Sequence, residues 1–476
     1  MSPEDKQSQD KAIDAKKPQK SSQGKSKEKK ESGIKVKGLI GSFFVESIMI
    51  DGKPAFAYYD YTTKRIGVCD NIQYENTIYL PWDKESYGYE PYTFTNDEIK
   101  ELASTEITKE SLLDEIKEIV EEHLYAKEEI KYLVIGDILL TYCLEWISTL
   151  HYIFAVGETG SGKSTLTYLF KIFGYRCMYG ANIPYANIYN FLGKDEEGTG
   201  TIAEDEAGDI SFQRDKIRLY KNSYFKGNKL PVVDMNNGRK QLFYCTFGFK
   251  VFSGERLPFD KGFLERLAIC FMMQGIPKKN IKKPSVEDVE RFRKLRNKII
   301  VWKLQNIEKG LGNTLSREVG RDEELYEDYL KIMSGTKYEE YGEKAVAYFV
   351  GQRHDRIWNS TEANIFRLVL KVIKANNEVI FQDLWNAFLE GSEITVEQDK
   401  GSYVDRDTGQ RITQNFLAKI LEEKFRGTKT VSIEFYKDRD GKQKQKRVTS
   451  YLLDEKDLVE LSKKYNIESD NVQDQN

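Results

Sequence analysis

Hydrophobic positions along this chain follow two different spacings, one typical of strands and one typical of helices. After Gly38 the segment LIGSFFVESIMI, the dipeptide Asp51-Gly52 and the segment KPAFAYYDY predict a β-hairpin, because Asp-Gly supports the left-handed backbone of a tight turn. Two shorter strands are predicted at 65–68 and 77–80. Residues 38–95 are therefore expected to form a β-rich N-terminal domain.

The predicted strands of this domain carry many aromatic side chains. They are Phe43, Phe44, Phe56, Tyr58, Tyr59 and Tyr61. Such rings can stack on nucleic-acid bases, but aromatic side chains on short strands more often form a hydrophobic core. The sequence leaves both interpretations open.

Two further stretches show the helical spacing. Residues 96–147 are predicted to form a helical linker, with helices over 110–124 and 128–144. Residues 276–358 return to the same pattern, with apolar side chains every three or four positions from Val289 to Trp302. The segment between these two helical stretches, 148–275, carries most of the recognisable chemistry.

A short apolar run, Tyr152 to Val156, leads directly into the sequence GETGSGKS, which matches the phosphate-binding P-loop G-x-x-x-x-G-K-[ST]. The glycines let the backbone curl so that its N–H groups point at an anion, and a helix predicted at 163–173 directs its positive end to the same place. The residues expected to bind ATP are Gly157, Glu158, Thr159, Gly160, Ser161, Gly162, Lys163, Ser164 and Thr165. Lys163 is expected to reach the β- and γ-phosphates, and Ser164 to ligate Mg²⁺.

A second motif, which ends in acidic residues, follows in the same segment. Residues 175–179 predict another strand, and a β run from Thr199 ends in acidic residues at Glu204, Asp205 and Glu206. This pattern is typical of a Walker B motif, in which Asp205 would hold Mg²⁺ and Glu206 would polarise the attacking water. Glu204 is a weaker candidate for either role, and an acidic surface turn is the alternative.

The order of these motifs resembles AAA+-type P-loop ATPases, and most closely the superfamily-three helicases and helicase–primase proteins of plasmids, viruses and integrated elements. A predicted strand at 248–252 ends in Ser253-Gly254-Glu255-Arg256, and Phe263-Leu264-Glu265-Arg266-Leu267 follows a proline-containing loop. The resemblance implies an α/β fold with a RecA/ASCE-type parallel sheet, a helical lid over 276–358, and ATP and Mg²⁺ as cofactors.

The resemblance also assigns roles to basic residues. It makes Arg266 the candidate arginine finger, which would act in the neighbouring subunit's site and neutralise charge on the γ-phosphate. Arg256 and Lys250 are candidates for the sensor at the end of the third strand, where this sequence lacks the usual asparagine. A surface ion pair with Asp260 or Glu265 is the alternative role for Arg266.

A basic segment separates the Walker B motif from the sensor strand. Its cations are Lys216, Arg218, Lys221, Lys226, Lys229, Arg239 and Lys240. Ring helicases of this type place such loops in a central pore, where basic and aromatic side chains hold single-stranded DNA without sequence preference. Residues 224–229, YFKGNK, are a candidate pore loop, and a solvated hairpin is an equally good interpretation.

The last predicted domain, 359–465, has the element order of a winged helix-turn-helix. Helices are predicted at 362–375, 381–389 and 413–425, with an irregular polar insertion before the third, and a hairpin at 430–436 and 446–453 follows. The wing is rich in lysine and arginine, and the third helix offers Gln414, Asn415, Lys419 and Lys424 on its predicted solvent face. We expect duplex DNA binding here, although winged helices also dock proteins.

The two ends of the chain and the overall composition complete the picture. Residues 1–37 hold 11 lysines against 6 acidic residues and almost no large apolar side chains, so a disordered basic tail is expected, and a polar tail over 466–476 is expected to be disordered as well. Of the 476 residues, 39% are hydrophobic and 31% charged, and the net charge is −3. The five cysteines and three histidines show no metal-ligand spacing, and no apolar run is long enough for a membrane span, so we expect a soluble cytoplasmic protein without a zinc site or membrane contact.

Together these features favour an ATP-dependent DNA motor, a helicase of the replicative type found in mobile elements, which assembles as a homo-oligomeric ring, most often a hexamer. The alternative is an ATP-switched DNA-binding regulator whose winged helix reads an operator. A small-molecule kinase is disfavoured because no acceptor pocket is recognisable. Primase activity is not predicted, because no acidic cluster with a zinc-binding module is recognisable in the sequence.

Overall fold

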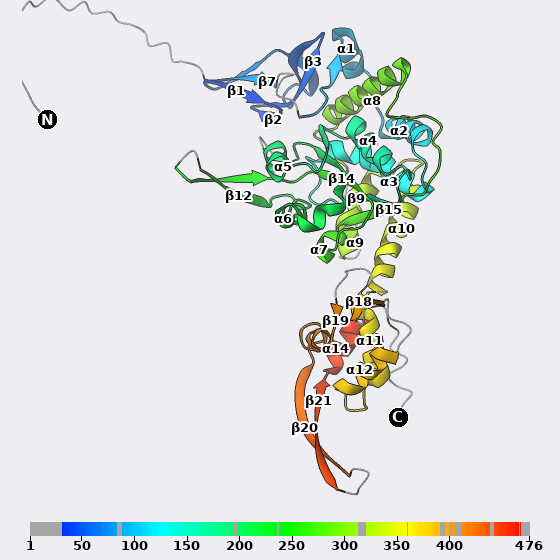
Figure 1. Ribbon diagram of the computed structural model, residues 1–476. Coiled ribbons are helices and arrows are strands. Elements are labelled where there is room, and N and C mark those ends of the chain that lie inside the picture. Colours follow the sequence, from blue (N-terminus) through cyan, green and yellow to red (C-terminus); the bar gives the residue numbers. More distant parts are fainter. Residues whose placement is uncertain are drawn as a thin grey trace, which may run out of the picture.

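The computed structural model describes residues 31–82, 88–193, 198–235, 238–312, 320–358, 360–390, 396–399, 402–405, 411–437, 442–465 and 467 (Figure 1). Residues 1–30 of the predicted N-terminal tail, and all of the C-terminal tail except Ile467, lie outside these residues. The prediction of disorder is wrong for residues 31–37, which form β1 (Glu31–Lys35) and the start of β2, with Val36 buried. Within the described part of the chain, no helix combines the length and the apolar character needed to cross a membrane.

The N-terminal region is a pair of small sheets. β2 (Lys37–Ile40), β3 (Phe43–Ile50), β4 (Lys53–Asp60) and β5 (Arg65–Cys69) pair in that order, and the short β8 (Thr93–Phe94) joins β3. The second sheet contains β1 (Glu31–Lys35), β7 (Thr77–Pro81) and β6 (Ile72–Tyr74).

The predicted hairpin around Asp51-Gly52 is confirmed. Ile50 pairs with Lys53, and the two turn residues have φ values of 49° and 80°. Of the aromatic side chains on these strands, Phe44, Phe56 and Tyr59 are buried. Those three rings therefore belong to hydrophobic core.

Helices α1 (Asn96–Ser104), α2 (Lys109–His123) and α3 (Glu128–Leu140) follow. The third is shorter than predicted, because a 3₁₀ turn over Thr141–Cys143 replaces its last α-helical turn. Its residues from Tyr132 to Leu140 are all buried, which explains why the sequence there is apolar on every side.

The centre of the molecule is a five-stranded parallel sheet in the order β10-β11-β14-β9-β15. Its strands are β9 (Tyr152–Val156), β10 (Cys177–Ala181), β11 (Thr201–Asp205), β14 (Phe249–Gly254) and β15 (Leu267–Phe271). The helices between them are α4 (Lys163–Phe173), α5 (Tyr185–Leu192), α6 (Arg214–Asn222) and α7 (Lys261–Leu264). Because parallel strands end at one edge, the segments that follow β9, β11 and β14 meet there.

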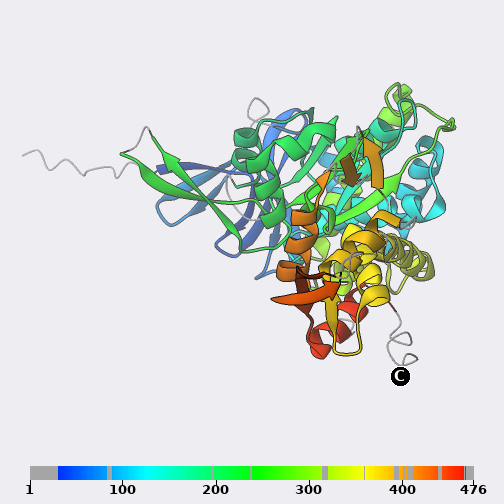
Figure 2. The ribbon, with the colours of Figure 1, turned by 60° about the horizontal axis from the view of Figure 1, so that its bottom comes forward.

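The basic segment forms an antiparallel hairpin of β12 (Lys229–Asp234) and β13 (Lys240–Cys245). Figures 1 and 2 both show this hairpin projecting from the body of the molecule. After the sheet come α8 (Val286–Gln305), α9 (Arg321–Met333) and α10 (Glu339–Trp358). Helix α8 packs against α1, α2 and α4, and α9 and α10 pack against α3. One hydrophobic core runs from Val36 to Phe349 and joins the N-terminal sheets, the linker helices, the central sheet and these helices.

The C-terminal region has a hydrophobic core of its own, formed between Ala363 and Tyr465. It contains α11 (Thr361–Val372), β16 (Glu378–Ile380), α12 (Phe381–Glu390), α13 (Gln414–Lys419), β20 (Thr428–Lys437), β21 (Gln443–Leu452) and α14 (Glu455–Lys464). The sheet order is β16-β21-β20, and the β20–β21 hairpin extends away from the helices (Figure 1).

Three details of this region differ from the sequence-based expectation. The polar insertion was predicted to be irregular, but it contains a small antiparallel sheet of β17 (Val396–Asp399), β18 (Ser402–Asp405) and β19 (Arg411–Ile412). The third predicted helix continues from α13 as a π-helical turn over Ile420–Lys424. Helix α14 was not predicted, because its apolar positions Leu458 and Leu461 give too short a pattern.

Candidate functional site: a phosphate-binding loop at the edge of the sheet

The predicted P-loop connects β9 to α4, with a strand before it and a helix after it. Gly160 and Gly162 adopt φ values of +82° and +87°, which side chains other than glycine rarely tolerate. A Cβ on Gly157 would lie 2.5 Å from the carbonyl oxygen of Met272. The loop is therefore shaped by its glycines, and its backbone passes directly into the first turn of α4.

Lys163 and Ser164 occupy the first turn of α4. The Lys163 ammonium donates to the carbonyl oxygens of Gly157 and Glu158, at 2.6 Å each, so the side chain folds back across the loop. The Ser164 hydroxyl donates to Asp205 Oδ1 at 3.1 Å. The loop and the predicted Walker B motif are thus brought together.

Asp205 is the centre of a small polar cluster at this edge. Besides Ser164, the hydroxyl of Ser253 donates to its Oδ1, and the hydroxyl of Tyr179 donates to its Oδ2 at 3.3 Å. Burial, and then the neighbouring Asp205 carboxylate, raises the pKa of Tyr179 to about 12, so this phenol stays protonated as a donor. Three strands, β10, β11 and β14, therefore contribute side chains to one cluster.

The two glutamates beside Asp205 have different environments. Glu204 is 1% exposed, and its carboxylate accepts hydrogen bonds from Lys216, from the Tyr220 hydroxyl and from the backbone N–H of Ile183. Glu206 is exposed and has left-handed backbone angles, φ 59° and ψ 37°. Such strain in a non-glycine residue is concentrated at functional sites, so of the two, Glu206 is the better candidate for contact with a substrate.

Burial raises the pKa of Glu204, although Lys216 and Tyr220 oppose the shift. The same ion pair corrects the expectation for Lys216, which was counted in the basic DNA-contacting segment. Lys216 is 2% exposed and binds Glu204, so it belongs to the interior.

The two sensor candidates, Lys250 and Arg256, have different environments in the structure. Lys250 is fully buried, and its ammonium donates to the carbonyl oxygens of Gly248 (2.8 Å), Thr246 (3.1 Å) and Ser223 (3.3 Å), near the start of β14 and away from the loop. The assignment of Lys250 as a sensor is therefore wrong. Ser253 reaches Asp205 from the carboxyl end of the strand instead, and Arg256 is exposed in the segment just beyond.

Arg266 lies at the opposite end of the sheet from the loop of its own chain. Its carbonyl oxygen accepts from the backbone N–H of Tyr152, the first residue of β9, whereas the loop follows the last residue of that strand. The guanidinium donates to the Gly262 carbonyl and lies over the Tyr224 ring at 4.4 Å. Asp260, one of the two alternative ion-pair partners considered for Arg266, pairs with Lys221 at 3.1 Å.

Residues 224–226 of the candidate pore loop are held against the segment that leads into β9. The Tyr224 carbonyl accepts from the Leu150 N–H, and Phe225 bridges to Thr149. The Lys226 ammonium donates to the Glu145 carbonyl at 3.0 Å. Only the residues from β12 onward extend as a hairpin.

Three residues at the edge were missed by sequence reasoning. Tyr179 and Ser253 bind Asp205, and the Glu255 carboxylate accepts from the Thr159 hydroxyl at 2.9 Å. For Ser253 and Glu255 the sequence does hold a signal, because both stand at or just beyond the carboxyl end of a strand in the same sheet, where the loop and Asp205 also lie. Tyr179 has no such signal, because its role depends on which strand lies beside β11.

No protein-family model matches the sequence, and no curated protein matches it. Among solved structures, the apo C-terminal region of NrS-1 (residues 305–718) aligns with 86% of this chain and 96% of its own, at 11% identity and a TM-score of 0.34. A full-length MCM homolog from Methanopyrus kandleri covers 65% of this chain and 73% of its own, at 12% identity and a TM-score of 0.33. The JCV helicase covers 53% and 70%, at 12% identity and a TM-score of 0.22. All three TM-scores are low, so these likenesses assign neither a family nor an activity to the chain.

The residues at this edge fit ATP and Mg²⁺. Gly160 and Gly162 hold the loop at positive φ, and a Cβ at residue 157 would collide with the Met272 carbonyl oxygen. A glycine-shaped loop at a helix N-terminus suits phosphate. The Ser164 hydroxyl and the Asp205 carboxylate, 3.1 Å apart, are hard oxygen ligands of the kind that Mg²⁺ prefers.

Proposed function

We propose that this chain is an ATP-hydrolysing motor that acts on DNA. The observation that carries the proposal is the meeting of the glycine loop, Ser164, Asp205 and Ser253 at the carboxyl edge of a parallel sheet. In this arrangement the loop N–H groups and Lys163 bind the phosphates, because both present positive charge at the start of α4. Ser164 and Asp205 would hold Mg²⁺, which supplies positive charge to offset that of the phosphate oxygens.

Glu206 is proposed to orient the attacking water and accept its proton. Its exposed carboxylate follows Asp205 directly, and its left-handed backbone separates it from the interior position taken by Glu204. Ser253, on the strand between the loop and the Walker B strand, fixes the orientation of Asp205 through a hydrogen bond. Thr159 and Glu255 would brace the loop at its outer side.

A ring, most often a hexamer, is part of the proposal. Arg266 lies at the far end of β9 from the loop, a strand of five residues that spans roughly 16 Å. It therefore cannot serve the site of its own chain without a large rearrangement. Supplied to a neighbour, its guanidinium would offset the charge that develops on the γ-phosphate.

DNA contact is assigned to two projecting hairpins. The β12–β13 hairpin carries Arg239 and Lys240 at its tip and exposed Phe243 on its second strand, a combination that suits phosphates and stacked bases of single-stranded DNA in a central pore. The C-terminal region is proposed to be a winged helix that contacts duplex DNA, with β20–β21 as its wing. Lys444, Lys446 and Arg447 on β21 would bind phosphates there.

The test is ATP turnover with and without single-stranded DNA of arbitrary sequence. We expect DNA to raise turnover severalfold in the wild type, and Lys163→Ala, Glu206→Gln and Arg266→Ala each to abolish most of it. A mixture of Arg266→Ala and Lys163→Ala chains should recover part of the activity, because some interfaces then combine an intact loop with an intact finger. A strictly monomeric protein with full turnover on DNA would overturn the ring.

The alternative function, an ATP-switched DNA-binding regulator, draws support from the separate core of the C-terminal region. A reader domain of this kind would bind one duplex sequence, and nucleotide would change the assembly state. Turnover that stays at its basal level with any single strand, together with affinity for one duplex site, would favour the regulator over the motor.

A further inference from the structure

A histidine and two carboxylates converge where helix α2 ends and helix α8 begins. Glu122 and His123 are the last two residues of α2, and Asp288 lies in the first turn of α8. One ligand atom from each of these side chains lies within 4.8 Å of the other two. His123 and Asp288 are buried and Glu122 is partly exposed, so the group lies just beneath the surface.

The His123 ring is oriented as an imidazole that binds a metal. Its Nδ1 lies 3.3 Å from the carbonyl oxygen of Lys279. Because a carbonyl only accepts, the neutral ring carries its proton on Nδ1 and keeps a lone pair on Nε2. Nε2 is buried without a hydrogen-bond partner among the described residues, and it lies 4.0 Å from Glu122 Oε2. A buried acceptor without a donor is costly, and a metal ion between these two atoms would bind both.

Asp288 is held in place from its other side. Its Oδ2 accepts from the Ser285 hydroxyl at 2.8 Å and from the Ser285 N–H at 3.2 Å, as part of the capping box of α8. Its Oδ1 faces the Lys279 ammonium, 3.0 Å away. Outer contacts of this kind orient the ligating side chains of metal sites. His123 and Asp288 therefore each have one atom that is fixed by a neighbour and one atom that faces the cluster.

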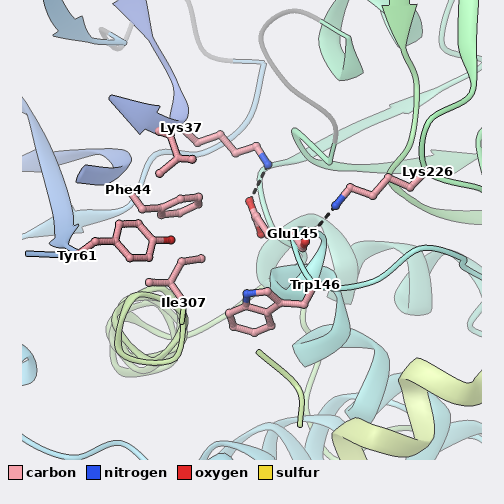
Figure 3. Close-up of a pocket in the computed structure, with 8 residues that line it drawn as sticks. Lys37, Phe44, Tyr61, Glu145, Trp146, Lys226 and Ile307 are labelled. Atoms are coloured by element: carbon pink, nitrogen blue, oxygen red, sulfur yellow. Dashed lines mark hydrogen bonds and ion pairs between the residues drawn. The ribbon is translucent and has the colours of Figure 1, made fainter. Parts of the chain in front are cut away.

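The cation in this cluster is the ammonium of Lys279. Its Nζ lies 3.1 Å from Glu122 Oε2 and 3.0 Å from Asp288 Oδ1. This side chain is 44% exposed, so it can leave for solvent at little cost. The ion pair between Lys37 and Glu145 (Figure 3) is different, because Lys37 is 1% exposed and its ammonium is shut off from solvent. Lys279 is therefore an exchangeable occupant of the space between two carboxylates.

Arg291 is the second cation beside the cluster. It donates to Glu122 at 3.0 Å and to Glu118 at 2.9 Å. Within this group of five side chains, two positive charges face the three carboxylates of Glu118, Glu122 and Asp288. A divalent ion in place of the Lys279 ammonium would bring the group to balance.

We propose that Glu122, His123 and Asp288 form a binding site for Zn²⁺, for which the Lys279 ammonium competes. Imidazole nitrogen and carboxylate oxygen are both zinc ligands, and a water would complete four-coordination. Ligand atoms around one zinc ion lie roughly 3.3–3.6 Å apart, so the three side chains would have to close by about 1 Å. Sequence reasoning rejected a zinc site from the spacing of cysteines and histidines, which does not reveal a ligand set drawn from two distant helices.

An occupied site would also fix the segment that runs beside the phosphate-binding loop. The N–H of Met272 donates to the carbonyl of Val156, where the loop begins, at 2.8 Å. Further along the same segment, the N–H of Lys279 donates to the carbonyl of Glu122 at 2.8 Å. A metal bound by Glu122 and Asp288 would therefore anchor the end of this segment that lies away from the loop.

The test is Zn²⁺ binding by the full chain after treatment with a chelator. Mg²⁺ is present in excess and nucleotide is absent, so that Mg²⁺ blocks sites made only of oxygen ligands and no phosphate sequesters the zinc. We expect calorimetry to show one Zn²⁺ bound per chain, and the melting temperature to rise with the concentration of Zn²⁺. The absence of binding, or binding without a rise in melting temperature, would overturn the proposal.

Two variants of partly exposed residues locate the metal. Glu122→Gln removes one ligand with little change of shape, and it is expected to weaken Zn²⁺ binding roughly tenfold or more. Lys279→Met removes the competing ammonium but keeps the main-chain N–H and carbonyl, and it is expected to tighten Zn²⁺ binding severalfold. A purely structural ion pair predicts no such tightening. Zn²⁺ affinity in Lys279→Met that equals or falls below that of the wild type would therefore overturn the proposal.

His354→Gln is the matched control, because this histidine is 58% exposed, lies outside the cluster and pairs with Asp322 at 3.2 Å. Its Zn²⁺ affinity should equal that of the wild type. Loss of binding in this control, or binding that Glu122→Gln leaves unchanged, would place the metal elsewhere and overturn the proposal. The readout is metal binding, so a failure of ATP turnover or of the motor would not affect it.

Discussion

The hydroxyl of Ser253 donates a hydrogen bond to the carboxylate of Asp205, across the boundary between two neighbouring strands of the central sheet. β14, which carries Ser253, lies between the loop-bearing strand β9 and the acidic strand β11. Ser253 is therefore the side chain by which β14 contacts Asp205, the proposed Mg²⁺ ligand. Ser164 donates to the same carboxylate oxygen and Tyr179 to the other, so the orientation of Asp205 depends on three hydroxyl donors.

Loss of the Ser253 hydroxyl should impair the chemical step. A hydrogen bond to a charged group contributes about 1.5–3 kcal/mol, so Ser253→Ala is expected to lower kcat for ATP at least tenfold. The apparent affinity for Mg²⁺ should fall as well, since Asp205 would lose one of its fixed donors. Steady-state turnover over a Mg²⁺ series measures both effects. Ser223→Ala, at a buried serine bonded to Thr246, is the matched control and should leave kcat and the Mg²⁺ dependence unchanged.

The two glutamates that flank Asp205 should give different phenotypes when each is replaced by glutamine. Glu206→Gln is expected to abolish most turnover but to retain nucleotide binding and the melting temperature, because this side chain is exposed. Glu204→Gln removes the partner of buried Lys216, and breaking a buried ion pair costs about 3–5 kcal/mol of unfolding free energy. Thermal melts and ATP-analogue binding on both variants separate the two roles. A normal melting temperature for Glu204→Gln would contradict the structural assignment.

Lys250 offers a test through pH. Burial holds the pKa of Lys250 well below its usual value of 10.5, so between these two values the unfolded chain holds a proton that the folded chain does not. The free energy of unfolding should therefore rise as pH increases from the lowered pKa of the folded state toward 10.5, and this residue should add no pH dependence below that range. Denaturant unfolding of wild type and Lys250→Met at several pH values measures the difference, because the variant should not show this rise. A sensor role would instead predict a loss of kcat at unchanged stability.

The sequence was most informative where local rules decide the structure. Glycine spacing and the apolar run before it predicted the loop and located α4 at Lys163–Phe173, and Asp51-Gly52 predicted the hairpin of β3 and β4. These features depend on backbone angles that few residues tolerate. The acidic end of β11 was predicted as well, because its carboxylates follow directly on a short β run downstream of the loop.

Residue roles that depend on packing were not predictable in the same way. Lys216 and Lys250 look like surface cations in the sequence, but the fold buries both and gives them a carboxylate and three carbonyls as partners. Residues 224–226 look like an aromatic and basic loop, but they contact the segment that leads into β9. A lysine can be buried when its ammonium is fully paired, and sequence spacing does not reveal a partner from another element.

The tip of the β12–β13 hairpin supplies the sharpest test of DNA contact by the ATPase region. Replacement of Arg239 and Lys240 by alanine should leave basal turnover intact, because both lie at the far end of the hairpin from the sheet. The increase in turnover caused by single-stranded DNA should largely disappear. The slope of log affinity against log salt should also fall by about one for each phosphate that the variant no longer neutralises.

Lys344→Ala provides the matched control for the hairpin, because this exposed lysine on α10 pairs only on the helix surface, with Glu340 at 2.7 Å. Its DNA stimulation and salt slope should match the wild type, since an exposed pair of this kind contributes little. A hairpin variant that keeps the full DNA stimulation and the wild-type salt slope would show that phosphate contact lies elsewhere. In that case the basic wing on β21 would become the first region to alter, with Lys446→Ala and Arg447→Ala measured on duplex DNA under the same salt series.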